Sequence, residues 1–263
     1  MIYYFSATGN SRHVAERIAA ALQEEARSIE QAPTEVVLKD NEVLGIVTPT
    51  HWNELPILVR EFIQKTTFRL ATNNYVFAVA TFGMLQGFVC EDARRELKRK
   101  GIAMNAGFSV KMPDNWTPMF DLSDPAKVQR IVDEAEPQID ELIGMIRQRV
   151  KGNRSKRRGP YFLRPFTDRM LHYERQTKFF TVDANACIGC GLCAKKCPVQ
   201  AIEMHDAPNA GEQNKQKKLP VWTAERCAIC LGCLHRCPKF AIQYNNKTQN
   251  HGQYQHSKYW KNK

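Results

Sequence analysis

Short apolar runs alternate with amphipathic segments along the first 150 residues. Runs of strand length, rich in β-branched and aromatic residues, lie at Ile2–Phe5, Val43–Val47 and Tyr75–Ala80. After the first run, apolar residues recur every four positions at Val14, Ile18 and Leu22, which predicts a helix. Strands that alternate with helices predict an α/β domain with a doubly wound parallel sheet, covered by helices on both faces.

The same periodicity predicts further helices. Ile57–Ile63 and Glu91–Lys100 each place apolar residues on one side of a helix. Asp124 and Pro125 have the residue types that cap and begin a helix, and regular apolar positions follow them. We expect this last helix to kink at Pro137. We assign residues 1–150 to the first domain.

The segment that follows is basic and aromatic. We interpret residues 151–179 as a connector that folds back onto one domain. A patch that binds nucleic acid is the less favoured alternative for this segment. The end of the chain, residues 247–263, is polar and basic and is expected to form a frayed tail.

Eight of the nine cysteines belong to an internal repeat with a period of forty residues. Each copy has the pattern C-x2-C-x2-C-x3-C-P and ends in Ala-Ile, at residues 187–202 and 227–242. The polar loop between the copies, about Asp206–Lys218, is expected to be exposed. The ninth cysteine, Cys90, lies outside the repeat, and we interpret it as a small buried hydrophobic residue.

Over residues 180–246 this pattern resembles the bacterial-type two-cluster ferredoxins, a smaller α+β domain that carries two [4Fe-4S] clusters. In that family the fourth cysteine of each copy binds the other cluster. The resemblance implies a first cluster held by Cys187, Cys190, Cys193 and Cys237. It implies a second cluster held by Cys197, Cys227, Cys230 and Cys233. Structural zinc is the alternative, because four thiolates also bind zinc.

Two further expectations follow from the cluster motifs. The glycines Gly189, Gly191 and Gly232 are expected to let the backbone approach the clusters closely. A domain of this size buries little apolar surface, so we expect it to unfold when the clusters are removed.

The first apolar run leads into a turn rich in hydroxyl groups, Ser6-Ala7-Thr8-Gly9-Asn10-Ser11, and then into a helix. Free backbone N–H groups and the positive end of the helix dipole converge there, which favours an anion. The turn is not a Walker loop, because the Gly-Lys-Ser/Thr sequence is absent. Hydroxyl groups without a lysine suit a terminal monophosphate better than a triphosphate with magnesium.

This turn resembles the FMN phosphate loop of flavodoxin, Ser/Thr-x-Thr-Gly-Asn/Thr-Ser/Thr. The resemblance implies that FMN binds with its phosphate at Ser6, Thr8, Asn10 and Ser11, with Gly9 forming the tight turn. It also implies that the flavin ring lies between two loops at the carboxyl ends of strands. The matching residues are Thr50, Trp52 and Asn53 in one loop and Thr81, Phe82 and Gly83 in the other.

Within these loops Trp52 is the candidate to stack on the flavin, and a core or interface aromatic is the alternative. Asn53 stands where flavodoxins often have a glycine, and asparagine enters the left-handed conformation less readily. His51 is a candidate proton donor, although an exposed loop histidine is the commoner case. The segment 112–116 is a further candidate to close the site.

The distribution of charge along the chain indicates the kind of partner that the protein binds. The net charge of +11 divides into −3 for residues 1–150 and +14 for residues 151–263. This basic part is expected to attract a redox partner protein with an acidic docking surface. The sequence has no secretory signal and no apolar segment long enough to span a membrane, so we expect a cytoplasmic protein.

As a whole the chain resembles the flavodoxin–ferredoxin fusion proteins of anaerobic bacteria. That resemblance implies an electron-transfer protein that moves electrons between FMN, two [4Fe-4S] clusters and a redox partner. Two alternatives remain open: an FMN-dependent reductase of a small molecule, fed by the clusters, and a redox sensor that binds nucleic acid.

Overall fold

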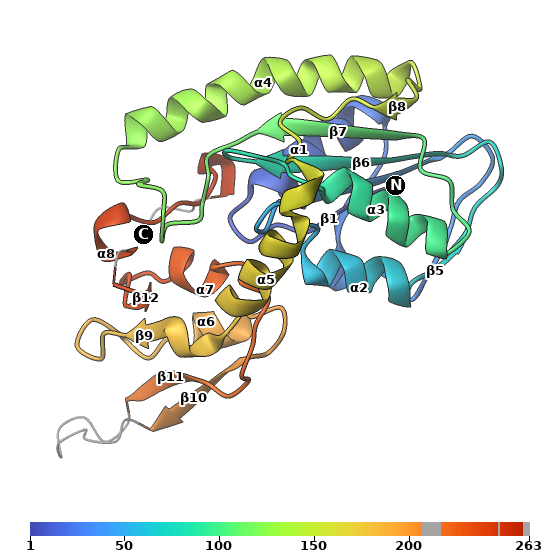
Figure 1. The fold of residues 1–263 in the computed structure, drawn as a ribbon. Coiled ribbons are helices and arrows are strands. Elements are labelled where there is room, and N and C mark those ends of the chain that lie inside the picture. The colour runs from blue at the N-terminus through green and yellow to red at the C-terminus, as the bar shows by residue number, and fades with distance from the viewer. Residues whose placement is uncertain (207–216, 247, 260–263) are drawn as a thin grey trace. The chain divides into compact units, whose positions relative to one another are not determined.

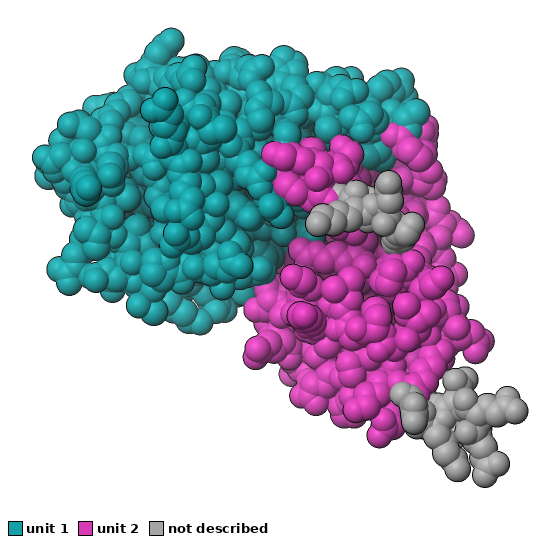
Figure 2. Space-filling model, turned by 180° about the vertical axis from the view of Figure 1, so that it is seen from behind, with its two compact units in different colours: residues 1–114, 126–170 teal, residues 115–125, 171–263 magenta. Residues whose placement is uncertain are grey.

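The computed structural model describes residues 1–206, 217–246 and 248–259. The chain divides into two compact units, which Figure 2 shows in separate colours. Unit 1 comprises residues 1–114 and 126–170, and unit 2 comprises residues 115–125 and 171–263. The division thus differs from a boundary at residue 150, because 151–170 belong with unit 1 and 115–125 with unit 2.

Unit 1 is built on a six-stranded sheet whose neighbouring strands are all parallel. Its order is β2-β1-β4-β6-β7-β8 (Figure 1). The strands are β1 (Ile2–Tyr4), β2 (Ala26–Ser28), β4 (Val43–Pro49), β6 (Tyr75–Phe82), β7 (Ala106–Lys111) and β8 (Gly152–Asn153). A separate parallel pair joins β3 (Glu35–Val37) to β5 (Thr67–Arg69). The strands β2-β1-β4-β6-β7, numbered among themselves along the chain, have the order 2-1-3-4-5 of the flavodoxin-like fold, which confirms the predicted fold class.

Helices cover both faces of this sheet (Figure 1). They are α1 (Asn10–Leu22), α2 (Ile57–Lys65), α3 (Val89–Arg99) and α4 (Pro125–Arg147). Helices α1 and α4 share one core with sheet residues such as Ile2. The next residue along β1, Tyr3, points to the opposite face and contacts Phe62 of α2, with 5.1 Å between the ring centroids. Every residue of the central strand β6 is buried, as expected for a strand covered on both sides.

The predictions for the helix at Pro125 and for Cys90 can be compared directly with this structure. Helix α4 begins at Pro125, as the capping pattern predicted, and it continues through Pro137 to Arg147. Cys90 is buried on α3, 1% exposed, with its Sγ atom 3.3 Å from the carbonyl oxygen of Phe108. The interpretation of Cys90 as a small buried residue is therefore confirmed.

The connector after α4 folds onto unit 1, as predicted, at least as far as Met170. It begins with β8, which pairs with β7, and leads into helix α5 (Arg164–Glu174). Arg164 Nη2 donates a hydrogen bond to Asp92 Oδ1 at 2.6 Å. Three residues later, Thr167 Oγ1 donates to Glu54 Oε1 at 3.1 Å. Both acceptor carboxyl groups are almost fully buried.

Arginines compensate most of the negative charge buried under α5. Arg60 Nη1 lies 2.8 Å from Glu96 Oε1, and Arg60 Nη2 lies 3.7 Å from Asp92 Oδ2. Glu54 is less well compensated, because its Oε2 atom is 4.0 Å from Arg60 Nη2. Burial, followed by the effect of neighbouring Asp168, raises the pKa of Glu54 to about 8. Glu54 therefore holds a proton at neutral pH.

Unit 2 contains two antiparallel ribbons and short helices, which agrees with the predicted smaller α+β domain. One ribbon pairs β10 (Ile202–Asp206) with β11 (Lys218–Trp222), and the other pairs β9 (Phe180–Val182) with β12 (Ile242–Tyr244). The helices within the repeats are α6 (Leu192–Lys195) and α7 (Gly232–His235). The core of this unit includes the buried side chains of Leu234 and Tyr244.

The prediction of a frayed tail is wrong for residues 248–259. This segment forms helix α8 (Thr248–His251) and buries Tyr254 and His256, which are 5% and 3% exposed. Gln253 Nε2 donates hydrogen bonds to the carbonyl oxygens of Leu234 and Cys237 at 2.6 and 2.9 Å. Composition misled the prediction because polar side chains of this segment bond to backbone groups of unit 2.

Two parts of the predicted chain organisation lie outside the described residues. They are residues 207–216, most of the polar loop between the repeats, and residues 247 and 260–263 of the tail. Within the described parts of the chain, no helix is long and apolar enough to cross a membrane.

Glu54 makes the stability of unit 1 depend on pH. Its pKa is higher in the folded than in the unfolded chain, so folding binds a proton between about pH 4.5 and 8. The free energy of unfolding should therefore fall as the pH rises through this range. Glu54→Gln should remove this contribution, which is at most about 1.4 kcal/mol per pH unit for one proton.

The measurement is urea unfolding at pH 6 and pH 8, with the exposed Glu61→Gln on α2 as the matched control. The loss of stability between the two pH values should be smaller in Glu54→Gln than in the wild type and in Glu61→Gln. Equal losses in all three proteins would contradict the assignment of a proton to Glu54.

Candidate functional site

The turn between β1 and α1 has the geometry of an anion site. Gly9 precedes α1 with φ 103°, a left-handed conformation that favours glycine. Its backbone N–H donates to Ser6 Oγ at 3.1 Å, which closes the turn. Helix α1 has no acidic residue in its first turn, so no carboxylate neutralises the positive end of the helix dipole.

Two residues of this turn connect it to other loops. Ser11 Oγ and Thr81 Oγ1 are 2.8 Å apart and share a hydrogen bond. Asn10 Nδ2 donates to the carbonyl oxygen of Pro113 at 3.2 Å. The structure thus brings the predicted phosphate loop together with the end of β6 and with the segment after β7. These hydrogen bonds also give Asn10 and Ser11 a structural role that the sequence did not indicate.

The loop after β4 forms a tight turn around Trp52 and Asn53. Both residues have positive φ, 47° and 65°, and His51 and Glu54 exchange backbone hydrogen bonds of 3.1 and 2.9 Å across the turn. Asparagine tolerates this conformation, whereas tryptophan is rarely found in it, at a cost of order 1 to 3 kcal/mol. Backbone strain of this kind is concentrated at ligand and active sites, and it falls here on the residue expected to stack on the flavin.

The second loop supports the first. Phe88 N–H donates to the carbonyl oxygen of Asn53 at 2.6 Å. A Cβ atom on Gly87 would lie 2.2 Å from Asn53, so only glycine allows the two loops to approach this closely. At Gly83 a Cβ atom would lie 2.1 Å from Asp114. Gly83 is therefore needed for packing against Asp114.

One buried polar atom in these loops is available to a ligand. The backbone N–H of Thr50 donates to the Thr81 carbonyl oxygen at 3.0 Å, which fixes the position of Thr50. Its Oγ1 atom is buried and has no hydrogen-bond partner among the described residues. A buried hydroxyl without a partner is costly, and a bound group that offers an acceptor or donor would satisfy it. This geometry fits a polar cofactor such as FMN.

Phe82 and the segment 112–116 are the other residues expected at the flavin site. Phe82 is 6% exposed, and its carbonyl oxygen accepts a hydrogen bond from Met112 N–H at 2.8 Å. The segment 112–116 is divided between the two units, and the expectation that it closes the flavin site is not supported at Trp116. That residue packs against Tyr244 in the core of unit 2, with ring centroids 5.2 Å apart.

Sequence reasoning missed Glu54 and Gly87. Glu54 ends the strained turn and is the buried acid with the raised pKa described above. An acidic residue in a predicted buried loop is a signal that could have identified it. The role of Gly87 can be recognised only in the structure, because its neighbour Asn53 is far away along the chain.

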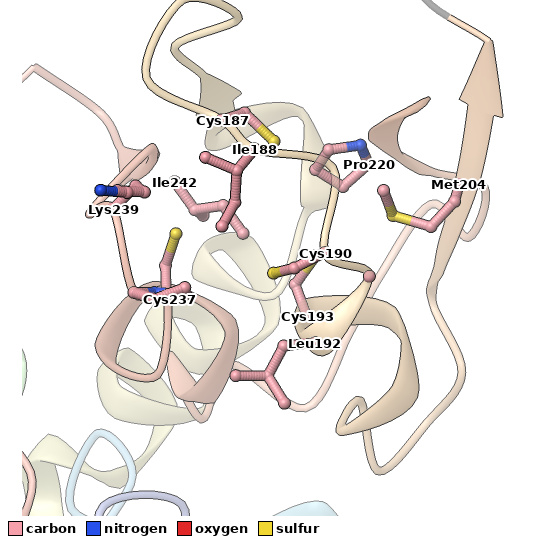
Figure 3. Close-up of a pocket in the computed structure, with 12 residues that line it drawn as sticks. Cys187, Ile188, Cys190, Leu192, Cys193, Met204, Pro220, Cys237, Lys239 and Ile242 are labelled. Atoms are coloured by element: carbon pink, nitrogen blue, oxygen red, sulfur yellow. The ribbon is translucent and has the colours of Figure 1, made fainter. Parts of the chain in front are cut away.

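The first set of four cysteines lines one hollow in unit 2. Figure 3 shows the sulfur atoms of Cys187, Cys190 and Cys237 facing the space between them, with Cys193 beside Cys190. Three of the four come from the first repeat and Cys237 comes from the second, as expected from the two-cluster ferredoxins. This hollow, hollow one, has a volume of about 20 Å³.

The second set lines a separate hollow. Hollow two has a volume of about 20 Å³, and its lining includes Cys197, Cys227, Cys230 and Cys233. Here the crossing residue is Cys197 from the first repeat. The four cysteines of each predicted set therefore lie together.

The two copies of the sequence repeat also have matching N–H···S contacts. The N–H of Gly189 lies 3.5 Å from Cys187 Sγ, and the N–H of Ile229 lies 3.3 Å from Cys227 Sγ. A second matching pair of N–H donors, from Ala201 to Cys197 Sγ and from Ala241 to Cys237 Sγ, spans 3.3 Å in both copies. Such bonds stabilise thiolates and orient them for metal binding.

The left-handed positions of the two repeats hold different residue types. The left-handed positions are Gly189 and Gly191 in the first copy, with φ 69° and 68°, but Ile229 and Leu231 in the second, with φ 50° and 51°. Gly232 follows Leu231 and is the first residue of α7. The repeats align by their cysteines, so the second copy holds larger residues in the conformation for which the first copy uses glycine.

The donor set of each hollow, four cysteines drawn from both repeats, fits an iron–sulfur cluster. Burial raises the pKa of Cys193 to about 11 and that of Cys227 to about 12. These thiols must therefore release protons when they bind iron, which couples cluster binding to pH.

His235, between the last two cysteines of the second motif, has a structural role. It is fully buried, its Nε2 atom lies 2.9 Å from the Asn115 carbonyl oxygen, and its Nδ1 atom lies 3.1 Å from the backbone nitrogen of Tyr254. Burial lowers its pKa to about 4. The neutral imidazole can donate through Nε2 and accept through Nδ1, and so connects three segments of unit 2.

Comparison with known protein families identifies both halves of the chain. Residues 1–141 match the model of a flavodoxin domain. Residues 186–241 match that of a 4Fe-4S dicluster domain. The first match covers more than half of the chain and includes both flavin loops. The second includes all eight cysteines of the repeat.

Similar individual proteins match over 64 to 76 residues. An uncharacterized polyferredoxin-like protein of Methanocaldococcus jannaschii is 38% identical, covering 24% of this chain and 38% of the relative. A ferredoxin of Pyrobaculum islandicum is 34% identical, covering 28% and 55%. NADH-quinone oxidoreductase subunit I of Pelobacter propionicus is 28% identical, covering 28% and 41%. The chain thus spans about two fifths to just over half of the length of these relatives.

The fold, the loops and the paired cysteine-lined hollows agree with these matches. The flavodoxin domain implies FMN, and the dicluster domain implies two [4Fe-4S] clusters. The chain therefore belongs to the flavodoxin family and, with its dicluster domain, is a flavodoxin–ferredoxin fusion.

Proposed function

We propose that the chain is an electron carrier in which FMN and the two clusters exchange electrons with a redox partner protein. The observation that carries the proposal is the presence in one chain of two complete cysteine-lined hollows and a flavin-type site. FMN exchanges one or two electrons, whereas each [4Fe-4S] cluster exchanges one. A chain with both kinds of cofactor can connect two-electron with one-electron chemistry.

In this proposal the turn at Ser6, Thr8 and Gly9 binds the phosphate of FMN, together with the N-terminus of α1. Asn10 and Ser11 contribute by holding this turn against neighbouring loops. The flavin ring lies at the loop of Thr50, Trp52 and Asn53 and the loop of Thr81, Phe82 and Gly83. Trp52 stacks on the ring, and Thr50 Oγ1 hydrogen bonds to it.

The clusters are assigned by the lining of the two hollows. Hollow one holds a cluster on Cys187, Cys190, Cys193 and Cys237, and hollow two holds a cluster on Cys197, Cys227, Cys230 and Cys233. The charge of the second half of the chain supports a partner with an acidic docking surface, because opposite charges accelerate association.

An anaerobic reductive titration, followed by absorbance, tests the electron-carrier function. Electrons added in steps should bleach both the flavin bands and the broad cluster absorption. In a variant that lacks the clusters, a reductant that reacts with the clusters should reduce the flavin more slowly than in the wild type. Equal flavin reduction rates with and without clusters would contradict electron exchange between the two kinds of cofactor.

Thr50→Val tests the flavin assignment, because it removes the unpartnered hydroxyl with little change in shape. FMN should bind about threefold to tenfold more weakly, the usual value of one hydrogen bond. The measurement is quenching of FMN fluorescence by the flavin-free protein. Thr48→Val at the end of the same strand is the matched control, and it should bind FMN normally because Thr48 Oγ1 already donates to the Pro49 carbonyl oxygen. Equal affinities of Thr50→Val and the wild type would contradict the assignment.

Cys197→Ser tests the crossing of ligands between the repeats. Loss of this residue from hollow two should lower the iron content from about eight toward about four atoms per chain. Buried Cys90→Ser is the control and should retain all of the iron. The assignment would be wrong if Cys197→Ser bound as much iron as the wild type, or if the wild type contained zinc in place of iron.

A further inference from the structure

Unit 2 has a third hollow, open at the surface and lined by no cysteine. Its volume is about 500 Å³, and it is formed by Gln176, Thr177, Lys178, Phe180, Val182, Pro220, Val221, Trp222 and Glu225. We call it the Trp222 groove. Its sides come from the segment that leads through β9 and from β11.

The base of the groove is an aromatic pair. Phe180 and Trp222 stack almost in parallel, with ring centroids 4.9 Å apart and an interplanar angle of 11°. Phe180 is 8% exposed, so the pair is packed into the unit. The apolar residues Val182 and Val221 lie beside this pair in the lining of the groove.

The groove shares walls with both cysteine-lined hollows. Phe180 and Trp222 line hollow two as well as the groove. Pro220 lines hollow one as well as the groove, and Figure 3 shows it near Cys187 and Cys190. A molecule in the groove is therefore separated from each hollow by a single layer of side chains.

The walls of the groove are fixed by bonds that do not involve a ligand. Strand β9 pairs with β12, and β11 pairs with β10. At one end, Thr177 N–H donates to the Glu225 carbonyl oxygen at 2.9 Å, and Thr177 Oγ1 lies 3.1 Å from the same oxygen. A site formed in advance binds without the entropic cost of ordering its walls.

Size and chemistry indicate the kind of occupant. The volume lies within the range of about 300 to 1,000 Å³ that is usual for small-molecule sites. A stacked aromatic pair with flanking apolar side chains favours a flat ring system over a sugar or a charged group. Polar groups are confined to residues such as Gln176, Lys178 and Glu225, enough to orient ring carbonyl oxygens. Strand β9 is only three residues long, which makes this a poor edge for an added peptide strand.

We propose that the Trp222 groove binds a planar, uncharged aromatic redox molecule of the quinone class, next to both clusters. The inference rests on the proposed function in one respect, because it takes the clusters to occupy hollows one and two. In each transfer a reduced cluster loses one electron and the bound quinone gains one. Two transfers, with two protons from water, complete the reduction to the hydroquinone.

Binding can be measured apart from electron transfer. Menadione, a naphthoquinone, is titrated into the oxidised holoprotein in a calorimeter, without any reductant. Val221→Arg places a long charged side chain in the groove at a residue that is 42% exposed and lines neither cysteine hollow. It should weaken menadione binding about tenfold or more, the equivalent of about 1.4 kcal/mol. Thr181→Arg is the control. Thr181 is an exposed residue of β9, on the other side of the groove from Val221 of β11, and it lies outside the groove lining, so this variant should leave the affinity unchanged.

The outcomes separate this proposal from the proposed function. Saturable binding that is lost in Val221→Arg and kept in Thr181→Arg supports the groove. Absence of saturable binding, or equal weakening in both variants, overturns it. In those cases normal iron content and normal reductive titration of the wild type would leave the electron-carrier function intact. Loss of cluster absorbance in the wild-type preparation would instead contradict the proposed function.

Discussion

The side chains that line the cluster hollows of unit 2 also form part of its core. Cys227 is buried among Leu231, Leu234 and Tyr244, and Cys193, Cys197 and Cys233 pack against the same group. Without metal, the thiols of Cys193 and Cys227 are protonated at neutral pH, because burial raises their pKa. Because unit 2 has little other apolar material, its stability depends on the groups that its cysteines bind. The tight turns, the N–H···S bonds and the left-handed residues of both repeats all serve this arrangement.

Unit 1 meets a different constraint, because it must hold loops from several strand ends against one another. Ser11 joins the first loop to Thr81, and Gly87 lets the second loop approach Asn53. The strained conformation of Trp52 persists because these contacts determine its neighbours on both sides. The rigid parallel sheet supplies the fixed strand ends from which the loops extend.

Much of this was predictable from the sequence where chemistry and spacing coincide. Thiolates three residues apart must gather in one short loop, so the cysteine sets could be assigned before the structure was known. The phosphate turn was equally visible, since a strand, Gly9 and a helix are contiguous. Packing between distant segments was not visible: Trp116 joins the core of unit 2, and Gln253 and Tyr254 bind the second repeat. Ile229 and Leu231 show that the demands of cysteine placement override local backbone preference.

The exchange of one cysteine between the repeats also bears on how the protein is made. The N-terminus of a chain leaves the ribosome first, so the first repeat emerges before the second repeat has been made. Neither hollow can then be complete, because each includes a residue from both copies. Hollow two gains its last cysteine at residue 233 and hollow one only at residue 237. The segment around Gln253, which bonds to the carbonyl oxygens of Leu234 and Cys237, emerges after both. During synthesis the nascent chain therefore presents unpaired thiols until the second repeat has emerged.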